Sequence, residues 1–221
     1  MGIERIKEIV GDTPCMSLAQ AKRMSDFIKA TRSRDILELG FAHGVSTCYM
    51  AEVLREQGLG GAITTIDLAS GTKRKPSIDE LLTECELSEY VTYYFEPKGF
   101  TWRLMKMLDE TSNPCFDLVY LDGGHSWDCT GFAFFLVDKL LRPGGWLIFD
   151  DIDWTYHNSQ ALKDSEQVAK MPVDFRETPQ VRKVFELLVS QHPSYINCKI
   201  EDKWGYAQKK KKGLLSFLKA A

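Results

Sequence analysis

The stretch FDLVYLDGGHSW at residues 116–127, with RPGGWLIFDD at residues 142–151, decides the fold. Each part contains a short apolar run that stops at carboxylates, the first at Asp122 and the second at Asp150 and Asp151. A helix-like pattern separates the two runs. Nearly continuous apolar strands joined by a helix are typical of a parallel sheet that is covered on both faces. The sequence therefore predicts strand, helix, strand, within an α/β fold.

Three carboxylates and a histidine follow these two strands. Because parallel strands end at the same edge of a sheet, Asp122, Asp150 and Asp151 should lie side by side, where open α/β sheets bind ligands. Grouped carboxylates repel one another unless a cation joins them, and an oxygen-only set suits Mg²⁺, Ca²⁺ or Mn²⁺. His125 could take a proton from a substrate held there. The alternative is that Asp122 caps a turn and the other two aspartates are solvated.

Length and composition fit one globular domain over residues 1–221. A net charge of -3 disfavours a general nucleic-acid binder, and 44% hydrophobic residues allow a sizeable core. The six cysteines include no CxxC pair, which favours reduced thiols over disulfides or zinc sites. Residues 1–5 lead into no apolar stretch of the kind a signal peptide has, and no apolar run approaches a membrane span. We expect a cytoplasmic protein without stable membrane association, and leave homo-oligomer formation open.

Hydrophobic periodicity places further elements around the central stretch. Strands that alternate with helices predict a doubly wound, Rossmann-like sheet that is mostly parallel and has helices on both faces. We expect strands at residues 35–39, 62–67 and 91–95, helices at 17–31, 45–57, 78–87, 100–108 and 179–191, and a closing antiparallel hairpin at 195–200 and 204–208.

Three segments fall outside this alternation. Residues 1–16 are mixed and read as an N-terminal extension. Residues 153–178 have weak periodicity, and their place directly after Asp151 predicts either a lid or substrate wall, with Trp154, Tyr156 and His157 near the substrate, or a plain surface loop. Residues 209–221 are basic and then amphipathic, which fits a solvated end or a contact for an anionic membrane or a partner.

The loop after the first strand, GFAHG at residues 40–44, has the character of a nucleotide site. Gly40 and Gly44 let the backbone turn tightly and approach a ligand, and the following helix points its free N–H groups at that ligand. Asp67 ends the second strand, where a carboxylate can accept both hydroxyls of a ribose. Ala42 stands where a strict GxGxxG loop needs its second glycine, which disfavours a dinucleotide site.

These residues resemble a known family. The ELG and GVST segments of residues 38–47, with Asp67 and the central stretch, look like a class I S-adenosylmethionine-dependent methyltransferase. The DGGHSW, LRPGG and Asp150-Asp151 motifs resemble the metal-dependent small-molecule O-methyltransferases of the methyltransferase-24 type, some of which act on sugars, with catechol O-methyltransferases as more distant relatives. The resemblance covers roughly residues 17–208, and it implies a seven-stranded sheet whose last strand is antiparallel.

The resemblance also implies roles for single residues. Glu38, Gly40 and Gly44 would line the methionine part of the cofactor, Asp67 its ribose, and residues 99–101 its adenine. His125 would be the general base, and Asp122, Asp150 and Asp151 the metal ligands. The full cofactor-binding set that we expect is Glu38, Gly40, Phe41, Ala42, Gly44, Ser46, Thr47, Asp67, Leu68, Gly99, Phe100, Thr101, Asp122 and Gly123.

The sequence thus predicts an S-adenosylmethionine-dependent O-methyltransferase that uses a divalent cation, Mg²⁺ or else Ca²⁺ or Mn²⁺. Its acceptor would be a small-molecule hydroxyl, on a sugar or on a vicinal diol of the catechol kind. Two other classes stay open at this point. One is a metal-independent methyltransferase whose aspartates are structural, and the other is a non-catalytic nucleotide-binding protein or an NAD-type oxidoreductase.

Overall fold

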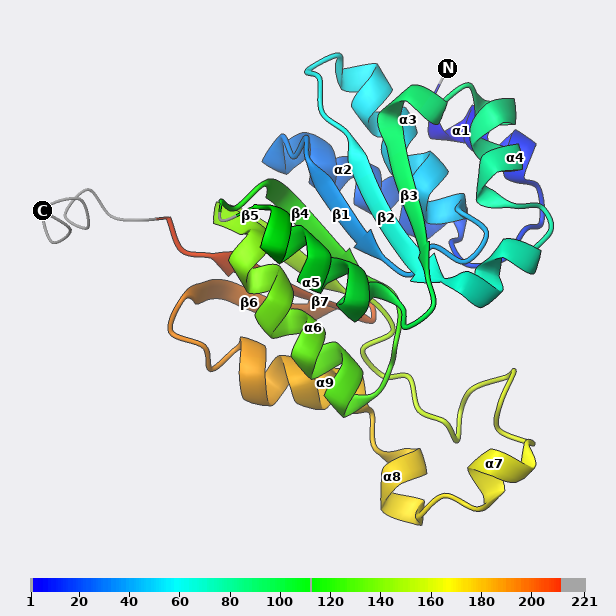
Figure 1. Cartoon of the computed structure of the whole chain (residues 1–221), viewed down its shortest axis with the longest axis vertical. Helices are drawn as coiled ribbons and strands as arrows, with labels where there is room; N and C mark the ends of the chain where they lie inside the picture. The colour runs from blue at the N-terminus through cyan, green and yellow to red at the C-terminus, as the bar shows by residue number, and fades with distance from the viewer. Residues whose placement is uncertain (1, 112, 212–221) are drawn as a thin grey trace, which may run out of the picture.

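A seven-stranded sheet forms the centre of the protein, which a computed structural model describes over residues 2–111 and 113–211 (Figure 1). The strand order is β3-β2-β1-β4-β5-β7-β6. The strands are β1 (Ile36–Leu39), β2 (Ile63–Leu68), β3 (Val91–Glu96), β4 (Phe116–Leu121), β5 (Leu141–Phe149), β6 (Tyr195–Glu201) and β7 (Trp204–Lys209).

The sheet is mixed in the way that the sequence predicts. Strands β1 to β5 pair in parallel, whereas β7 pairs antiparallel with β5 on one side and with β6 on the other. The terminal hairpin therefore inserts its second strand between β5 and β6. The predicted Rossmann-like sheet with an antiparallel last strand is confirmed.

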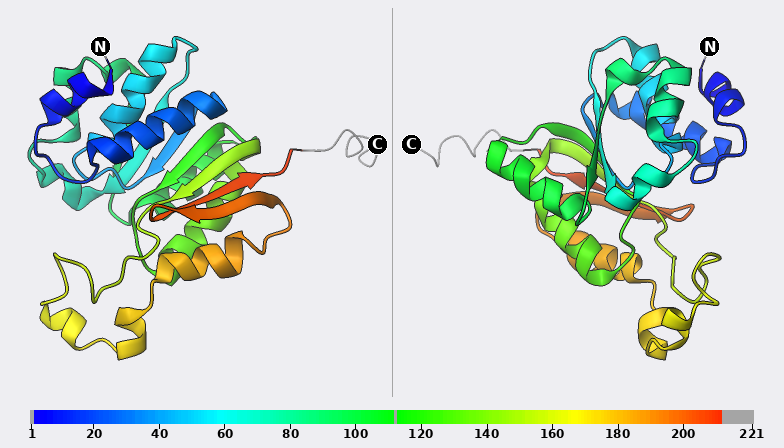
Figure 2. Two further views of the ribbon diagram at one scale, coloured as in Figure 1. Left: turned by 180° about the vertical axis from the view of Figure 1, so that it is seen from behind. Right: turned by 45° about the vertical axis from the view of Figure 1, so that its right-hand side comes forward.

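Helices cover both faces of the sheet, as predicted (Figure 2). They are α1 (Ile3–Val10), α2 (Leu18–Thr31), α3 (Val45–Gln57), α4 (Ile78–Cys85), α5 (Phe100–Glu110), α6 (Trp127–Leu140) and α9 (Gln180–Val184), with short 3₁₀ turns η1 (Ala69–Lys73) and η2 (Ser88–Tyr90). One core forms under α1 to α4 and the other under α5, α6 and α9. Strand residues alternate between them, so that Tyr120 faces the first core and Val119 and Leu121 face the second.

Local sequence signals set several helix ends. Ser17 caps α2 in a capping box with Gln20, and the side chain of Ser126 accepts from the amide of Cys129 at the start of α6. The main differences from the prediction concern one helix, one strand and one change of helix type. Residues 3–10 form α1, β5 begins five residues early at Leu141, and the predicted helix after Pro179 changes at Phe185 to a π-helical turn, η3 (Phe185–Val189).

The N-terminal extension is part of the domain rather than an appendage, because Ile3, Ile6 and Val10 of α1 are buried in the first core. Of the basic tail, residues 209–211 are described, and the rest of the predicted tail lies outside the described residues. Within the described ranges, no helix combines the length and the apolar character needed to cross a membrane.

Between β5 and α9 the chain projects beyond the body of the domain (Figure 1). This segment, residues 153–178, carries two short helices, α7 (Glu166–Ala169) and α8 (Val173–Glu177). It is fastened to the domain by an ion pair between Asp153 and Arg182, whose Nε lies 2.6 Å from Asp153 Oδ1. The region predicted as a lid or a loop thus has defined local structure and a fixed attachment.

Candidate functional site

Four polar or glycine positions line up where the central strands end. Leu39 pairs with Ile66 on one side and with Leu121 on the other, and Leu121 pairs with Phe149. The next residue of each strand therefore falls in one row, which contains Asp67, Gly40, Asp122 and Asp150. Parallel strands with short crossovers require this arrangement, and the carboxyl edge of such a sheet is the usual place for a ligand.

The loop at residues 40–44 is tightly wound. Gly40, Ala42 and Gly44 all have positive φ, at 93°, 49° and 92°. A Cβ on Gly40 would lie 2.4 Å from the carbonyl oxygen of Asp122, so the end of β4 can approach β1 only because position 40 is glycine. Gly44 then starts α3 without a side-chain cap, which leaves the first amides of this helix facing the edge.

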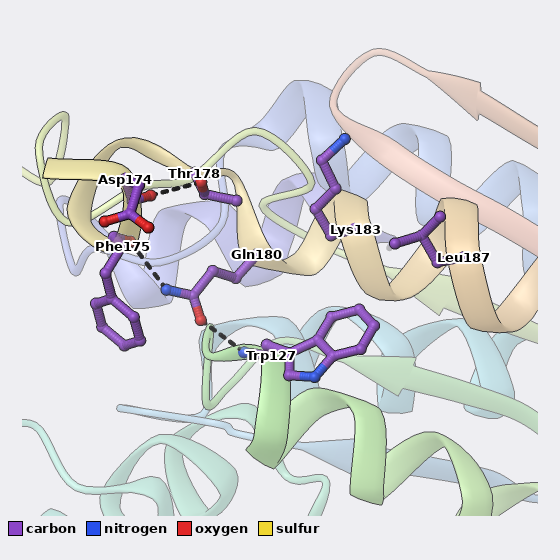
Figure 3. A pocket seen from close by; sticks show the side chains of 7 residues that line it. All are labelled: Trp127, Asp174, Phe175, Thr178, Gln180, Lys183 and Leu187. Carbon is purple, nitrogen blue, oxygen red and sulfur yellow. Dashed lines mark hydrogen bonds between the residues drawn. The ribbon is translucent and has the colours of Figure 1, made fainter. Parts of the chain in front are cut away.

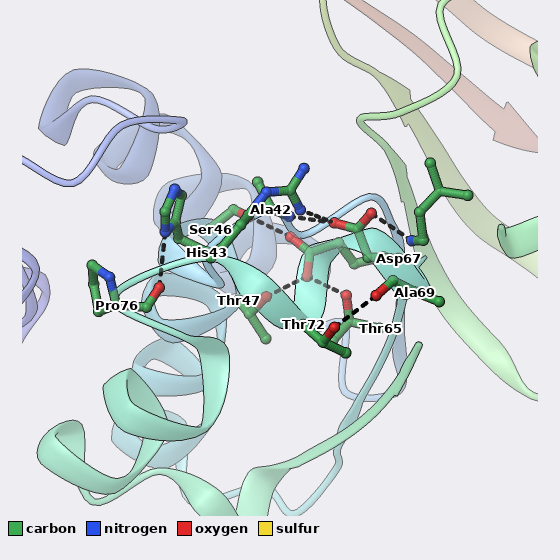
Figure 4. A network of polar contacts seen from close by, with 12 residues as sticks. Ala42, His43, Ser46, Thr47, Thr65, Asp67, Ala69, Thr72 and Pro76 are labelled. Atoms are coloured by element: carbon green, nitrogen blue, oxygen red, sulfur yellow. Dashed lines mark hydrogen bonds and ion pairs between the residues drawn. The ribbon is translucent and has the colours of Figure 1, made fainter. Parts of the chain in front are cut away.

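Glu38 lies beneath this loop and is fully buried. Its carboxyl group accepts hydrogen bonds from Ser46 and Thr47 at the start of α3 and from Thr65 on β2 (Figure 4). Burial raises the pKa of Glu38 to about 7, although the three hydroxyl groups oppose this shift. These three predicted cofactor residues, Glu38, Ser46 and Thr47, thus form an internal brace for the loop.

Asp67 is nearly buried at the end of β2, and its carboxylate is held on all sides (Figure 4). Its Oδ2 accepts from the amide of Ala42 at 2.7 Å and from Arg74 at 2.9 Å, and its Oδ1 accepts from the amide of Leu68 at 2.6 Å. The sequence analysis gave no role to Arg74, which lies in a short basic run at residues 73–75. Arg74 occupies the carboxylate that was predicted to bind a ribose.

The other predicted cofactor positions gather at the same edge. A Cβ on Gly99 would contact Leu68, and a Cβ on Gly123 would contact the ring of Phe100. Phe41 is buried against Phe95 of β3, with ring centroids 5.2 Å apart. Phe41 therefore supports the loop from inside the core. Thr101 follows in the first turn of α5, half-buried.

The acidic end of the edge holds a compact group of Asp122, His125 and Asp151. One ligand atom from each lies within 4.8 Å of the other two. His125 Nε2 is 3.2 Å from Asp151 Oδ2, but the two atoms are not aligned for a hydrogen bond, and Nε2 has no such partner among the described residues. Burial, followed by the charges of Asp150 and Asp151, raises the pKa of Asp122 well above its usual range.

Asp150, the third predicted metal ligand, does not share this group. Its carboxylate is buried and accepts hydrogen bonds from the Tyr120 hydroxyl, from Trp204 Nε1 at 2.6 Å and from the amide of Asp151 at 2.6 Å. Two of these donors, Tyr120 and Trp204, belong to the first core, where Ile148 also packs. The predicted set of three aspartates is therefore split, with two carboxylates at the cluster and one in the core.

The segment after Asp151 supplies an unbroken series of aromatic rings. Trp154 lies against His125 with ring centroids 4.8 Å apart, Tyr156 follows 4.9 Å from Trp154, and Phe175 of α8 stacks 5.7 Å from Tyr156. Two of the predicted wall residues, Trp154 and Tyr156, thus extend from the cluster. The exposed His157 joins the two arms of the segment only through its backbone, which donates to the carbonyl of Arg176.

Two cavities flank this series. One, of about 530 Å³, opens beside Asp151 and is lined mainly by polar side chains, namely Asp151, Asp153, Trp154, Asn158, Ser159, Gln160 and Lys203. The other, of about 410 Å³, is lined by Trp127, Asp174, Phe175, Thr178, Gln180, Lys183 and Leu187 (Figure 3). In it the buried Gln180 accepts from the amide of Trp127 and donates to the carbonyl of Phe175. The sequence analysis did not predict these two hydrogen bonds of Gln180, because no motif marks them.

The cluster has the chemistry of a cation site. Two carboxyl groups and one imidazole nitrogen converge, burial and then the charges of neighbouring carboxylates raise the pKa of Asp122, and the imidazole nitrogen lacks a hydrogen-bond partner among the described residues. A divalent cation would balance this charge, and one or two carboxylates with water suffice for Mg²⁺. The residues at the acidic end therefore fit such an ion.

A family comparison covers the whole of this edge. Residues 37–152, just over half of the chain, match the profile of a family described as a methyltransferase domain. The matched span includes the glycine loop, Asp67 and the acidic cluster. A search of curated protein sequences found no match.

Solved structures share the fold over almost the whole chain. An O-methyltransferase of Bacillus cereus in complex with S-adenosylhomocysteine aligns with a TM-score of 0.62 at 18% identity, over 94% of this chain and 88% of that chain. The O-methyltransferase TomG of Streptomyces achromogenes, in complex with S-adenosylmethionine, aligns with a TM-score of 0.63 at 20% identity, over 94% and 89% of the two chains. With the family match, the conclusion is direct: the chain belongs to this methyltransferase family and is an S-adenosylmethionine-dependent enzyme.

Proposed function

We propose that the protein is a divalent-cation-dependent O-methyltransferase that acts on a hydroxyl group of a small molecule. The observation that carries the proposal is the meeting of Asp122, Asp151 and His125 at the carboxyl edge, next to the glycine loop. Solved neighbours add support, because they include O-methyltransferases from Bacillus cereus and Streptomyces achromogenes.

The cofactor would lie over the loop at residues 40–44, with its ribose at Asp67. Neighbours solved with S-adenosylmethionine or S-adenosylhomocysteine support this ligand. Asp67 already accepts from Ala42 and Arg74. The ribose hydroxyls would therefore displace Arg74 or share the carboxylate with it. Gly99, Phe100 and Thr101 would border the adenine, since Gly99 lies beside Leu68 at the same edge.

The reaction asks little covalent chemistry of the protein, since the sulfonium methyl group is already electrophilic. Alignment of the acceptor oxygen with that methyl group is the main requirement. Asp122 and Asp151 would hold the cation, which supplies positive charge that favours a deprotonated acceptor hydroxyl. His125 would accept the hydroxyl proton at Nε2, the atom that has no hydrogen-bond partner among the described residues. Trp154 packs on the imidazole ring and would hold its orientation.

The acceptor would enter through the cavity beside Asp151. Its lining of carboxylate, amide and hydroxyl groups around the single ring of Trp154 fits a polyhydroxylated or catechol-like molecule. The segment at residues 153–178 would then be a substrate wall. Its attachments at Asp153 and Gln180 support a preformed wall.

An acceptor screen with labelled S-adenosylmethionine tests this function. Matched pairs of acceptors should be compared, each a vicinal diol and its singly hydroxylated analogue, with Mg²⁺ and with excess chelator. We expect transfer to the diols in Mg²⁺, and loss of transfer on chelation. Full activity in chelator would favour a metal-independent methyltransferase, a class that the close approach of His125 to Asp151 also allows.

The wall is tested by Trp154→Ala, with Trp102→Ala on the exposed face of α5 as the control. Loss of the ring should raise the KM for the acceptor about tenfold, because a stacked ring contributes roughly 0.5–1.5 kcal/mol beyond its buried area. The Trp102→Ala protein should keep the wild-type KM. Unchanged acceptor KM and acceptor preference in a folded Trp154→Ala protein would return the segment to a plain surface loop.

A further inference from the structure

The buried carboxylate of Asp150 accepts three hydrogen bonds. Its Oδ2 receives the hydroxyl of Tyr120, and its Oδ1 receives both Trp204 Nε1 and the amide of Asp151, each at 2.6 Å. Tyr120 and Trp204 are completely buried, and Asp150 is 5% exposed. A rotation of Asp150 toward a cation would strand two buried donors, and buried donors without partners are costly.

The hydrogen bond from Asp151 to Asp150 lies at the turn that aims Asp151. Asp151 has a φ of 50°, in the left-handed region that residues other than glycine seldom adopt. Asp150 Oδ1 holds the amide of this residue, and the Asp151 carboxylate then reaches to 3.2 Å from His125 Nε2. The conformation that brings Asp151 to the cluster is thus tied to the position of the Asp150 carboxylate.

Trp204 is itself fixed from two sides. Arg23 of α2 lies over its indole ring, 4.4 Å from the centroid, and the same guanidinium contacts Asp202 at the β6–β7 turn. The carbonyl of Lys203 in this turn accepts from the amide of Ile152 at 3.1 Å, just after Asp151. The terminal hairpin therefore contacts the Asp150-Asp151 pair on both sides. Trp204 donates to Asp150, and Lys203 accepts from the amide that follows Asp151.

From this geometry we infer that Asp150 is a positioning residue and not a metal ligand: with Tyr120 and Trp204 it holds Asp151 in the conformation that binds the cation. The inference rests on the cation dependence proposed above. It assigns different roles to two adjacent aspartates that a sequence motif does not distinguish. It also gives the buried indole of Trp204 in β7 an indirect role in cation binding.

Mg²⁺ titration of the purified full-length chain distinguishes a positioning residue from a ligand by the sign of the effect. Tyr120→Phe and Trp204→Phe each remove one donor from Asp150 and keep an aromatic ring in the core. If Asp150 positions Asp151, both variants should bind Mg²⁺ about 10- to 100-fold more weakly, as is usual when a ligand loses its supporting contact. If Asp150 is a ligand, both variants free it and should bind Mg²⁺ as tightly as the wild type or more tightly.

The indole N–H resonance of Trp204 gives a second readout that does not depend on activity. In ¹⁵N-labelled protein, Trp204→Phe identifies the signal, and Asp150→Asn should move it. Saturation with Mg²⁺ should leave it in place, whereas Asp151→Asn should abolish Mg²⁺ binding with little change in this signal. The exposed Trp102 provides the control resonance.

Two results would overturn the inference separately from the function. Movement of the Trp204 signal to the Asp150→Asn position on adding Mg²⁺ would identify Asp150 as a ligand. Tighter Mg²⁺ binding by Tyr120→Phe and Trp204→Phe would do the same while leaving the proposed function intact. Failure of the wild-type protein to bind any divalent cation would instead refute the cation-dependent function, and the positioning role with it.

Discussion

The two ends of the carboxyl edge are built in opposite ways. At the cofactor end, Asp67 is held by two backbone amides and Arg74, and Glu38 accepts from three hydroxyl groups. At the other end, Asp122, Asp151 and His125 face one another, and Nε2 of the histidine lacks a partner among the described residues. The cofactor end is therefore held by internal hydrogen bonds, whereas the acidic end presents carboxyl and imidazole groups that a cation could join.

Because of this difference, substitutions at the two ends should affect different properties of the protein. A network in which every polar group is hydrogen-bonded can hold its conformation before a ligand binds. Substitutions at the cofactor end should therefore change the free energy of unfolding and the cofactor affinity. Carboxyl groups that are gathered at one point are costly to ionise in the free protein, so substitutions there should act through cation binding and turnover. Substitutions at each end should therefore have separable effects.

The largest effect should come from Asp151→Asn. The change removes a charge from the acidic end and should lower turnover by about 10²–10³, the range seen when one stabilising group is lost at a reacting centre. Cofactor affinity should stay within twofold, because Asp151 lies away from the glycine loop. His125→Ala is the companion variant: it should lower turnover and leave the cation in place. Loss of cation binding in the His125 variant would reassign this residue as a ligand.

Gly40→Ala should act on the other end through stability. The added Cβ would lie 2.4 Å from the Asp122 carbonyl oxygen at a φ of 93°, and we expect a loss of about 2–3 kcal/mol in the free energy of unfolding. Gly58→Ala is a matched control, since Gly58 also has a positive φ, 57°, but nothing lies within 4 Å of its added Cβ. Denaturant titration should show the smaller loss, about 1 kcal/mol, for the control. Equal losses in the free energy of unfolding for the two variants would mean that β4 does not approach β1 closely at Gly40.

Asp67→Ala should weaken S-adenosylmethionine binding by about 1–3 kcal/mol, because hydrogen bonds to a charged acceptor are lost. Arg74→Ala separates this effect from the ion pair, since it removes the partner that occupies Asp67 and leaves the carboxylate. Calorimetry should show intact or tighter cofactor binding in the Arg74 variant. Tight binding of NAD in place of S-adenosylmethionine by the wild-type protein would contradict the cofactor assignment.

Glu38→Gln should change the pH dependence of stability. Burial raises the pKa of Glu38 to about 7 from its usual 4.5, so the folded wild-type protein holds a proton that the unfolded chain releases. This contribution is complete below about pH 4.5 and is lost as the pH rises through 7. Relative to wild type, the glutamine variant should therefore gain about 2–3 kcal/mol between pH 5 and pH 8. Thermal unfolding across this range measures it, and parallel pH curves for the two proteins would contradict the raised pKa of Glu38.

Periodicity and strand ends were enough to predict the alternating sheet, the hairpin and the gathering of Asp67, Gly40 and Asp122 at one edge, because each follows from local pattern and parallel pairing. The direction of the Asp150 side chain could not be predicted in this way. Its partner Trp204 lies 54 residues later and reaches Asp150 only through the pairing of β7 with β5. A motif records which residues are adjacent, and not which face each side chain takes.

Other differences have local causes. Helix α1 was missed because its eight residues place only Ile3, Ile6 and Val10 in the core. The start of β5 was hidden because Pro143 and two glycines interrupt its apolar pattern, and the pairing shifts register between Phe116 and Leu118 opposite them. Arg74 and Gln180 carry no motif. Arg74 contacts the carboxylate of Asp67, and Gln180 contacts the backbone of Trp127 and Phe175, and no sequence pattern records either set of contacts.

Paired calorimetric titrations test the account most directly. Mg²⁺ and S-adenosylmethionine should each be titrated into the wild-type, Asp67→Ala and Asp151→Asn proteins. We predict that the wild type binds both, that Asp151→Asn loses Mg²⁺ and keeps the cofactor, and that Asp67→Ala binds the cofactor more weakly and keeps Mg²⁺. A wild-type protein that binds no divalent cation at millimolar concentration, or an Asp151→Asn protein that loses both ligands together, would contradict the separation of the two ends.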